Sequence, residues 1–469
     1  MELVTQIPSL TGSPPRVVRN ISDLVAFFEQ SQQPRVNWRI GTETEKFGVV
    51  GLVPDALPYA GPVSVVAVMA KLAARFGWAP ESESPGGPLI ALKRGVASIT
   101  LEPGAQLELS GAPLLDVHAT CAEMEHHVRE LELVSIPLGI SWLSVGFHPF
   151  ARRDELPIIP KARYGIMKEY LPLRGDGALD MMQRTATVQV NLDYDTEEDA
   201  LRKTRIFLKL APIVQAMTAH SPLAESKLTP WESLRGDVWL RMDPARSGLI
   251  ESLWTNPRPR YETYVNWALD SGMFLFKRGA QVIANTGQTF RSFMEDGFEG
   301  HRATFDDWVL HINTLFPEIR LKKTIEVRCC DAQPMDTLLS VPALWTGIGY
   351  DETALEQAER LTHTLRFDEV NAARPELVRH GLSTHLAGKS LREWSEEVLR
   401  IASDGLARRA RTDANGADER RYLLPLIRLN QMGLTPAARL RRKVQRTSTT
   451  TSAAQSIIES TRMIPDFYA

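Results

Sequence analysis

The stretch from Arg39 to Gly48 constrains the fold more than any other part of the chain. Strand-forming residues such as Ile40 and Phe47 alternate there with polar ones, a pattern that predicts a β-strand. Side chains two apart in a strand share a face, so Glu43 and Glu45 point the same way. Two crowded carboxylates repel each other unless a cation lies between them. The strand is a candidate wall of a metal site, although a surface strand with two solvated glutamates would explain this pair alone.

Other segments repeat the alternating pattern and carry further acidic side chains. They are 97–111, which reads as two strands around Pro103-Gly104 with Glu102 and Glu108; 141–150; 186–194, with Thr187, Gln189, Asn191 and Asp193 on one face; and 321–328, with Glu326. Alternating strands joined partly by turns are typical of an antiparallel sheet with one functional face. The sequence therefore predicts an α+β fold rather than a doubly wound one.

Helical periodicity fills most of the remaining chain. Helices are expected from Ser22 as N-cap through 28, over 65–76 between Ser64 and Gly77, and over 116–138, 162–170, 197–217 and 261–276. Residues 351–433 are mainly helical in pattern. We divide the chain into an N-terminal lead and helix (1–37), a catalytic sheet domain (38–350), a helical C-terminal region packed on it (351–446), and a Ser/Thr-rich linker and tail (447–469).

The composition limits the class of protein. The chain has 469 residues, with 54 Lys and Arg against 57 Asp and Glu, so no basic footprint for nucleic acid is evident. Three cysteines are too few for a disulfide framework. No secretory signal and no apolar run long enough to span a bilayer is found. We therefore expect a cytoplasmic protein with small-molecule substrates and no membrane or nucleic-acid partner.

Five glutamates on the predicted strands suggest a shared chemistry: Glu43, Glu45, Glu102, Glu108 and Glu326. A site built from carboxylates selects hard cations such as Mg²⁺. The chain has no Gly-rich phosphate loop, and several Mg²⁺ ions in a sheet cavity would let it handle a nucleoside triphosphate without one. Arg328 shares a face with Glu326 and would take charge on a transferred phosphoryl group, unless the two simply form an ion pair.

Other polar residues are candidates to complete the site. Gln189 and Asn191 would bind a ligand or be satisfied by neighbouring strands, and Arg235 would clamp a substrate carboxylate or lie on the surface. Asp243 and Arg246 are weaker candidates, and His148 and His220 have no ligand spacing, so we interpret both as structural. Cys121 falls on an apolar helical stripe and is expected in the core, whereas Cys329 and Cys330 are expected to line the pocket, with a redox switch as the alternative.

Several of these segments, taken in order, match motifs of one known family. They are Gly41-Thr-Glu-Thr-Glu-Lys-Phe-Gly48, Leu101-Glu-Pro-Gly-Ala-Gln-Leu-Glu-Leu-Ser-Gly-Ala-Pro113, Thr185-Ala-Thr-Val-Gln-Val-Asn-Leu-Asp193, Tyr264 with Asp270, and Phe316-Pro-Glu-Ile-Arg-Leu-Lys-Lys323 followed by Glu326-Val-Arg328. Each motif alone is a weak signal, but together they cover roughly residues 20 to 440. The combination resembles glutamate-cysteine ligase of the plant and proteobacterial type.

This resemblance implies a curved antiparallel sheet like the glutamine synthetase catalytic domain, with ATP and several Mg²⁺ ions. The implied reaction joins the γ-carboxyl of glutamate to the amine of cysteine through a γ-glutamyl phosphate, the first step towards glutathione. The five glutamates are then metal ligands, Arg328 and Arg235 are catalytic, and Gln189, Asn191 and Lys46 bind the nucleotide. We expect a monomer or a homodimer.

One segment departs from the family pattern. Where the plant-type enzymes have a run like Arg-Gly-Ala-Asp-Gly-Gly-Pro, this chain has Arg328-Cys-Cys-Asp-Ala-Gln-Pro334. The Asp-Ala-Gln-Pro portion is similar to the ligases that feed ergothioneine synthesis and also make γ-glutamylcysteine. A ligase with a different amine acceptor, a ligase of that other pathway, and a non-catalytic glutamate-binding paralogue therefore stay open as alternatives.

Overall fold

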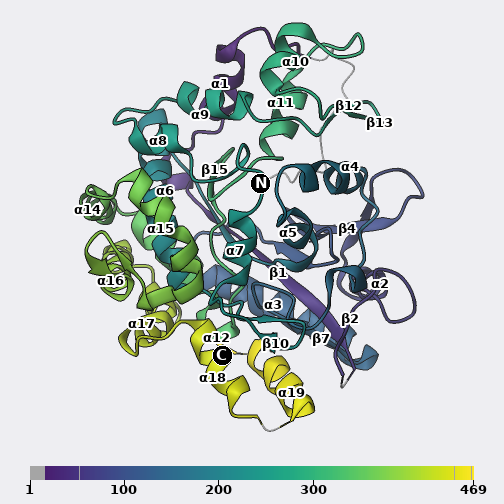
Figure 1. Ribbon diagram of the computed structural model, residues 1–469, viewed down its shortest axis with the longest axis vertical. Coiled ribbons are helices and arrows are strands. Elements are labelled where there is room, and N and C mark those ends of the chain that lie inside the picture. The colour runs from purple at the N-terminus through teal and green to yellow at the C-terminus, as the bar shows by residue number, and fades with distance from the viewer. Residues whose placement is uncertain (1–15, 52, 448, 466, 469) are drawn as a thin grey trace.

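A large antiparallel sheet organises the computed structural model, which describes residues 16–51, 53–447, 449–465 and 467–468. Its long central strand β1 (Ile40–Val50) crosses the molecule diagonally in Figure 1. Within the described residues the sheet has ten strands, in the order β15-β16-β8-β1-β6-β5-β4-β3, with β2 and β7 both paired to the second half of β1. The other strands are β2 (Asp55–Ala56), β3 (Ala79–Ser82), β4 (Leu89–Arg94), β5 (Ala97–Leu101), β6 (Leu107–Ser110), β7 (Ile140–Leu143), β8 (Val188–Leu192), β15 (Ile319–Leu321) and β16 (Ile325–Val327).

Helices and short strand pairs surround this sheet (Figure 1). The helices are α1 (Ile21–Glu29), α2 (Val65–Phe76), α3 (Val117–Ser135), α4 (Ala162–Tyr170), α5 (Ala178–Arg184), α6 (Glu197–Met217), α7 (Leu234–Leu240), α8 (Glu251–Thr255), α9 (Tyr261–Leu269), α10 (Phe290–Asp296), α11 (Phe305–Ile312), α12 (Met335–Leu338), α13 (Ser340–Gly349), α14 (Glu352–Thr362), α15 (Phe367–His380), α16 (Leu391–Arg409), α17 (Leu424–Gln431), α18 (Pro436–Gln445) and α19 (Thr450–Thr461). The short strands are β9 (Leu223–Ala224), β10 (Lys227–Leu228), β11 (Ser247–Gly248), β12 (Leu275–Arg278), β13 (Gln281–Ala284), β14 (Phe316–Pro317), β17 (His385–Leu386) and β18 (Lys389–Ser390).

The register of the central strands separates two faces of the sheet. Glu43 on β1 lies opposite Gln189 on β8, and Glu45 lies opposite Glu108 on β6. Directly paired residues share a face, so these side chains project from one side, which we call the cavity face. The intervening residues, such as Val190, are buried on the other side, where α3 and α13 pack. The predicted α+β fold, with a large antiparallel sheet and flanking helices, is confirmed.

Local capping explains where several helices begin and end. The Ser64 hydroxyl accepts a hydrogen bond from Ala67 N at 3.1 Å at the start of α2, and Gly77 ends this helix with φ of 73°. The predicted bounds of α4 and α6 also agree with the structure. Helix α1 differs, because Asn20 rather than Ser22 provides its cap.

Three predicted segments are shorter than expected. The segment 321–328 is not one strand, because the polar run at 322–324 turns the chain between β15 and β16. The helix predicted over 261–276 ends at Leu269, ahead of Gly272, and its last residues belong to β12. Strand β7 ends at Leu143, since the following backbone bonds elsewhere, as where Gly146 N donates to His220 O.

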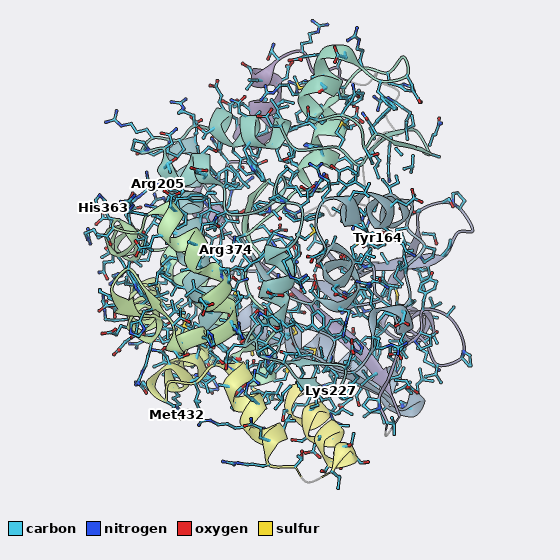
Figure 2. The ribbon with its side chains drawn as sticks, viewed as in Figure 1. Tyr164, Arg205, Lys227, His363, Arg374 and Met432 are labelled. Atoms are coloured by element: carbon cyan, nitrogen blue, oxygen red, sulfur yellow. The ribbon has the colours of Figure 1, made fainter. Side chains whose placement is uncertain are left out.

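The C-terminal region is helical, as predicted, and packs against α6 and α13. Arg374 of α15, labelled in Figure 2, forms a buried ion pair with Glu318, just ahead of β15, and so links this region to the sheet. Where the sequence analysis expects a Ser/Thr-rich linker, residues 450–461 form helix α19, because Thr449 caps it and Ile457 is buried. The division of the chain into domains stays a prediction.

Membrane-spanning helices were also considered. In the part of the chain that the structure describes, every helix is either too short or too polar to cross a bilayer.

Candidate active site

A cavity of about 1160 Å³ lies over the cavity face of the sheet. The sheet forms its floor, and its walls come from α4, α5, α7, α11 and the hairpin β12–β13. Figure 1 shows α4, α5 and α7 beside one another near β1, at the centre and right of the view. All five predicted glutamates, both predicted arginines and both predicted amides line this cavity: Glu43, Glu45, Glu102, Glu108, Glu326, Arg328, Arg235, Gln189 and Asn191. Strand register thus brings together residues that are almost 300 positions apart.

Four of the glutamates form a group that we call the carboxylate cluster: Glu43, Glu45, Glu102 and Glu108. The first two come from β1 and the last from β6, while Glu102 lies on the turn between β5 and β6. Their hydrogen-bond partners are neutral: Asn191 Nδ2 donates to Glu43 at 2.8 Å, and Thr100 Oγ1 donates to Glu108 at 2.5 Å. None of the ion pairs formed among the described residues involves these four carboxylates.

The turn that carries Glu102 is held in a strained conformation. Ala105 has φ of 66°, a left-handed conformation that an alanine rarely adopts. The Gln106 side chain stabilises the turn, because its Oε1 accepts from Gly104 N at 2.8 Å and its Nε2 donates to Thr185 O at 2.8 Å. The strain is therefore offset by contacts to the chain ahead of β8, and it places Glu102 above the sheet.

Burial and mutual repulsion raise the proton affinity of the carboxylate cluster. Burial, followed by the negative charge of Glu102, raises the pKa of Glu45 to about 8 against the opposing effect of Arg235 and Arg328. Burial, followed by the charges of Glu43, Glu102 and Glu45, raises the pKa of Glu108 well above its ordinary value. The ionised form of the cluster is therefore disfavoured unless a cation neutralises it.

Glu326 has a different environment from the other four glutamates. Its fully buried carboxylate accepts from Arg320 Nε at 2.6 Å and from Arg328 Nη1 at 3.0 Å, and Lys322 also donates to it. Burial alone would raise the pKa of Glu326, but these three cations hold it well below its ordinary value. The end of the cavity around Glu326 is therefore net positive, beside the negative carboxylate cluster.

The predicted amides bridge these two groups. Gln189 Oε1 accepts from Arg328 Nη1, while Asn191 donates to Glu43 and accepts from Thr324 Oγ1 at 2.9 Å. Both amides are thus satisfied by residues on or next to the neighbouring strands, as the alternative interpretation in the sequence analysis expects. Arg328 is held between Gln189 and Glu326, which fixes its guanidinium over the cavity face.

Arg235 enters the cavity from the first turn of α7 and is only 3% exposed. It is not the surface arginine of the alternative interpretation. Its Nη1 donates to Cys329 O at 3.2 Å and its Nη2 donates to Arg328 O at 2.8 Å, while its buried Nε has no partner among the described residues. Both predicted arginines therefore meet at the end of β16.

Helix α4 adds a second group of side chains that the sequence analysis did not assign. Tyr164, labelled in Figure 2, donates to Leu101 O at 3.1 Å and approaches Glu102 Oε1 at 3.4 Å. Lys161 Nζ donates to the same carbonyl at 2.7 Å, and Arg163 Nη2 donates to the Tyr164 hydroxyl at 3.1 Å. Burial and the nearby Arg163 charge lower the pKa of Lys161 to about 8. The carboxylate cluster thus has positively charged neighbours on this side as well, at longer range.

Lys46 was predicted to bind the nucleotide, and the structure corrects this. Lys46 is fully buried on the opposite face of β1, where its Nζ donates to Thr44 O and lies 3.1 Å from His127 Nε2 on α3. Burial lowers the pKa of Lys46 to about 7. The reason is the period of two in a strand, which turns residue 46 away from residues 43 and 45.

The prediction that the two adjacent cysteines line the pocket is also wrong. Cys329 and Cys330 are fully buried core residues and do not line the cavity, with sulfur atoms 3.9 Å apart. Cys121 is buried on α3, as expected. Asp243 and Arg246 form a buried ion pair of 2.9 Å outside the cavity lining. His148 and His220 are also buried there, bonded to backbone groups.

A preformed metal site would need at least three ligating side chains that converge on one point. Among the described residues, no three His, Cys, Asp or Glu side chains converge as a complete ligand set. This arrangement fits Mg²⁺, because that ion is usually held by one or two carboxylates together with water and substrate phosphates rather than by an all-protein cage. The four clustered carboxylates supply such oxygen donors, and none of them forms an ion pair within the described part of the chain.

Some cavity residues escaped the sequence analysis for identifiable reasons. Arg320 and Lys322 gave no signal of their own, because the alternation over 321–328 predicts a single strand and the structure has a hairpin. Recognising the polar turn at 322–324 would have placed Arg320 opposite Glu326. The α4 side chains could not be assigned from the sequence, because helical periodicity does not predict which cavity a helix will border.

Comparisons with known proteins identify the family of this chain. A model described as glutamate-cysteine ligase family 2 (GCS2) matches residues 39–459. The chain is 38% identical over 421 residues to a chloroplastic glutamate-cysteine ligase of Brassica juncea, covering 89% of this chain and 80% of the relative. It is 39% identical over 421 residues to chloroplastic glutamate-cysteine ligase B of Oryza sativa subsp. japonica, covering 89% and 82%.

A solved structure shares the fold. It is the glutamate-cysteine ligase of Francisella tularensis in complex with AMP, with a TM-score of 0.54, 12% identity, and coverage of 90% of this chain and 88% of that one. The plant relatives are named as chloroplast proteins, which contradicts the cytoplasmic location expected from the sequence. The chain belongs to glutamate-cysteine ligase family 2, a family of enzymes that ligate glutamate to cysteine.

Proposed function

We propose that this chain uses ATP and Mg²⁺ to join the γ-carboxyl of L-glutamate to the amine of L-cysteine. The observation that carries the proposal is the pairing of two groups in one cavity: the carboxylate cluster and, beside it, Arg235 and Arg328. A phosphorylated substrate carries negative charge that the arginines can bind. Its counter-ions need oxygen ligands that the cluster can offer.

The chemistry follows from the weakness of a carboxylate as an electrophile. Transfer of the γ-phosphoryl group of ATP to the γ-carboxyl of glutamate converts that group into an acyl phosphate, with release of ADP. The cysteine amine then attacks the acyl carbon, the carbon-oxygen bond to phosphate breaks, and inorganic phosphate leaves. The proposed product is γ-glutamylcysteine.

Glu43, Glu45, Glu102 and Glu108 are the residues that would hold Mg²⁺. Bound Mg²⁺ would supply positive charge that neutralises the phosphates and favours in-line transfer. The raised pKa values of Glu45 and Glu108 support this assignment, because a nearby cation would favour the ionised carboxylates that the protein alone disfavours.

Glu326 was grouped with the metal ligands, and we now assign it another role. Its carboxylate already has three cationic partners, so it anchors Arg320, Lys322 and Arg328 on the cavity face. Arg328 is then fixed where charge develops on the transferred phosphoryl group, and its Gln189 contact supports that orientation. Asn191 orients Glu43 in the same way.

Arg235 is proposed to bind a carboxylate of the amino-acid substrate. Its unpartnered Nε and its position at the cavity wall support this role. The other substrates are ATP and cysteine, and we propose a monomer or a homodimer without nucleic-acid or membrane partners, in keeping with the net charge of -3.

The test is ADP formation by the purified chain with ATP, Mg²⁺ and glutamate, with cysteine compared against other amines one at a time. We expect ADP and γ-glutamylcysteine in equal amounts with cysteine, and little turnover without glutamate, without an amine or with EDTA. Faster turnover with another amine would identify a γ-glutamyl ligase of different acceptor specificity. Absence of ADP formation under every condition, with ATP still bound, would identify a non-catalytic paralogue.

A further inference from the structure

Asp331 follows β16 and has no role in the proposed chemistry, yet it is completely buried among polar groups. Its Oδ2 accepts from His220 N at 2.8 Å and from Ser221 Oγ at 2.6 Å, and its Oδ1 accepts from Ser233 Oγ at 2.8 Å. The carboxylate therefore joins the segment after β16 to two other parts of the chain, the loop before β9 and the start of α7.

The two serine hydroxyls pass this contact on to α7. Ser221 Oγ accepts from Arg235 N at 3.1 Å, and Ser233 Oγ accepts from Gly236 N at 2.9 Å as the N-cap of the helix. Each hydroxyl donates its only proton to Asp331, so its lone pairs are free to accept from the helix backbone. Two first-turn amides of α7 are thus connected to one carboxylate through single hydroxyl groups.

Arg235 is fixed at both of its ends by this arrangement. Its backbone N is held through Ser221, and its guanidinium donates to the carbonyls of Arg328 and Cys329, three and two residues before Asp331. The guanidinium also lies 3.9 Å from Asp331 Oδ1. An anchored long side chain loses little further freedom when it binds a ligand.

The neighbouring residues fix Asp331 in turn. Gln333 Nε2 donates to Thr218 O at 2.6 Å and to Asp331 O at 3.1 Å, and Ala332 N donates to Ala186 O at 3.0 Å. An added Cβ on Gly146 would lie 2.5 Å from the Asp331 Cγ, so the segments that carry these two residues are in close contact there. The buried Asp-Ala-Gln segment at 331–333 therefore fixes residues 218–221, and these contact the start of α7.

We infer that Asp331 is a positioning residue that sets the orientation of Arg235 towards the substrate carboxylate by ordering the Ser221 and Ser233 hydroxyls. This inference rests on the proposed role of Arg235. It assigns to Asp331, which the run 328–334 shares with the family pattern, a function in binding the amino-acid substrate rather than the nucleotide.

The experiment measures KM for glutamate and for ATP separately in Asp331→Asn, Arg235→Gln and the double variant. Asparagine keeps the shape of Asp331 but places an amide donor against hydroxyl or amide donors and removes the charge beside Arg235. We expect Asp331→Asn to raise the KM for glutamate by about tenfold to a hundredfold, a size typical of a displaced positioning group, with the KM for ATP changed by less than about twofold. The double variant should match Arg235→Gln alone, because both changes remove the same interaction.

The matched control is Glu419→Gln, which changes another fully buried carboxylate, one that accepts from Val117 N at the start of α3 and pairs with Arg409. It should lower stability without changing either KM. If Asp331→Asn does not fold, Ser233→Ala tests the same link more gently and should raise only the KM for glutamate.

Effects of Asp331→Asn and Arg235→Gln that multiply in the double variant, or an equal rise in the KM for ATP, would overturn the inference. The proposed function fails separately, if the unmodified chain forms ADP without need of glutamate or if Arg235→Gln leaves the KM for glutamate unchanged.

Discussion

Replacing Glu45 by Gln should stabilise the metal-free protein while removing its activity. Glutamine has nearly the same shape, and its Oε1 can still accept the hydrogen bond that Thr187 N donates to Glu45 at 3.0 Å. The substitution therefore removes one ionisable carboxyl group and little else. Opposite effects on stability and activity are typical of a site that stores repulsion for the sake of ligand binding.

The magnitude follows from the pKa of about 8 in the folded protein against the ordinary value of 4.5. The folded state holds this proton more tightly than the unfolded state does, so stability is lost as the pH rises from 4.5 towards 8. With about 1.4 kcal/mol for each pKa unit, the loss at pH 7 is about 3 kcal/mol. Removing one carboxyl also changes the pKa values of the other carboxylates in the cluster, so the effect is not a simple sum. We expect Glu45→Gln to raise the free energy of unfolding by about 1–3 kcal/mol at pH 7.

The assay is urea unfolding of the protein in EDTA, followed by tryptophan fluorescence at pH 5 and pH 7.5. The stabilisation should be present at pH 7.5 and should fall below about 1 kcal/mol at pH 5, because that pH lies only slightly above the ordinary pKa of 4.5 at which the unfolded state loses its proton. Glu396→Gln on the exposed face of α16 is the matched control and should change neither value. With Mg²⁺ and substrates, Glu45→Gln should lower kcat by at least about a hundredfold. A variant that is less stable than the parent at pH 7.5, or that keeps its turnover, would refute the reasoning.

Three further predictions use other parts of the structure. Glu326→Gln leaves its buried cationic partners unneutralised and should lower the free energy of unfolding by about 3–5 kcal/mol, measured by denaturant titration. Lys46→Met should leave the KM for ATP within about twofold of the parent, because Lys46 faces α3; a large rise would place it in the site after all. Single replacements of Cys329 and Cys330 by Ala should retain turnover after treatment with hydrogen peroxide as well as before it, since both thiols are buried outside the cavity; activity that depends on either thiol would restore the redox-switch hypothesis.

Strand alternation alone identified most of the cavity face. The period of two put Glu43 with Glu45 and Gln189 with Asn191, and the structure keeps each pair on one side of the sheet. The same rule applied to Lys46 would have excluded it from the cavity. Helix ends were also readable where a polar cap and a glycine marked them, as at Ser64 and Gly77.

The tertiary structure decided what these side chains do, because charge and exposure depend on neighbours that are distant in the chain. Five glutamates look alike in the sequence, but the strands around β1 gather four that form no ion pair among the described residues. The β15–β16 hairpin and the residue after it surround Glu326 with three cations. For Arg235 the sequence left a substrate clamp and a surface residue both open, and the contacts of α7 with Asp331 place it in the cavity wall. Local patterns determine which face a residue occupies, and only the packing of strands and helices determines which charges meet there.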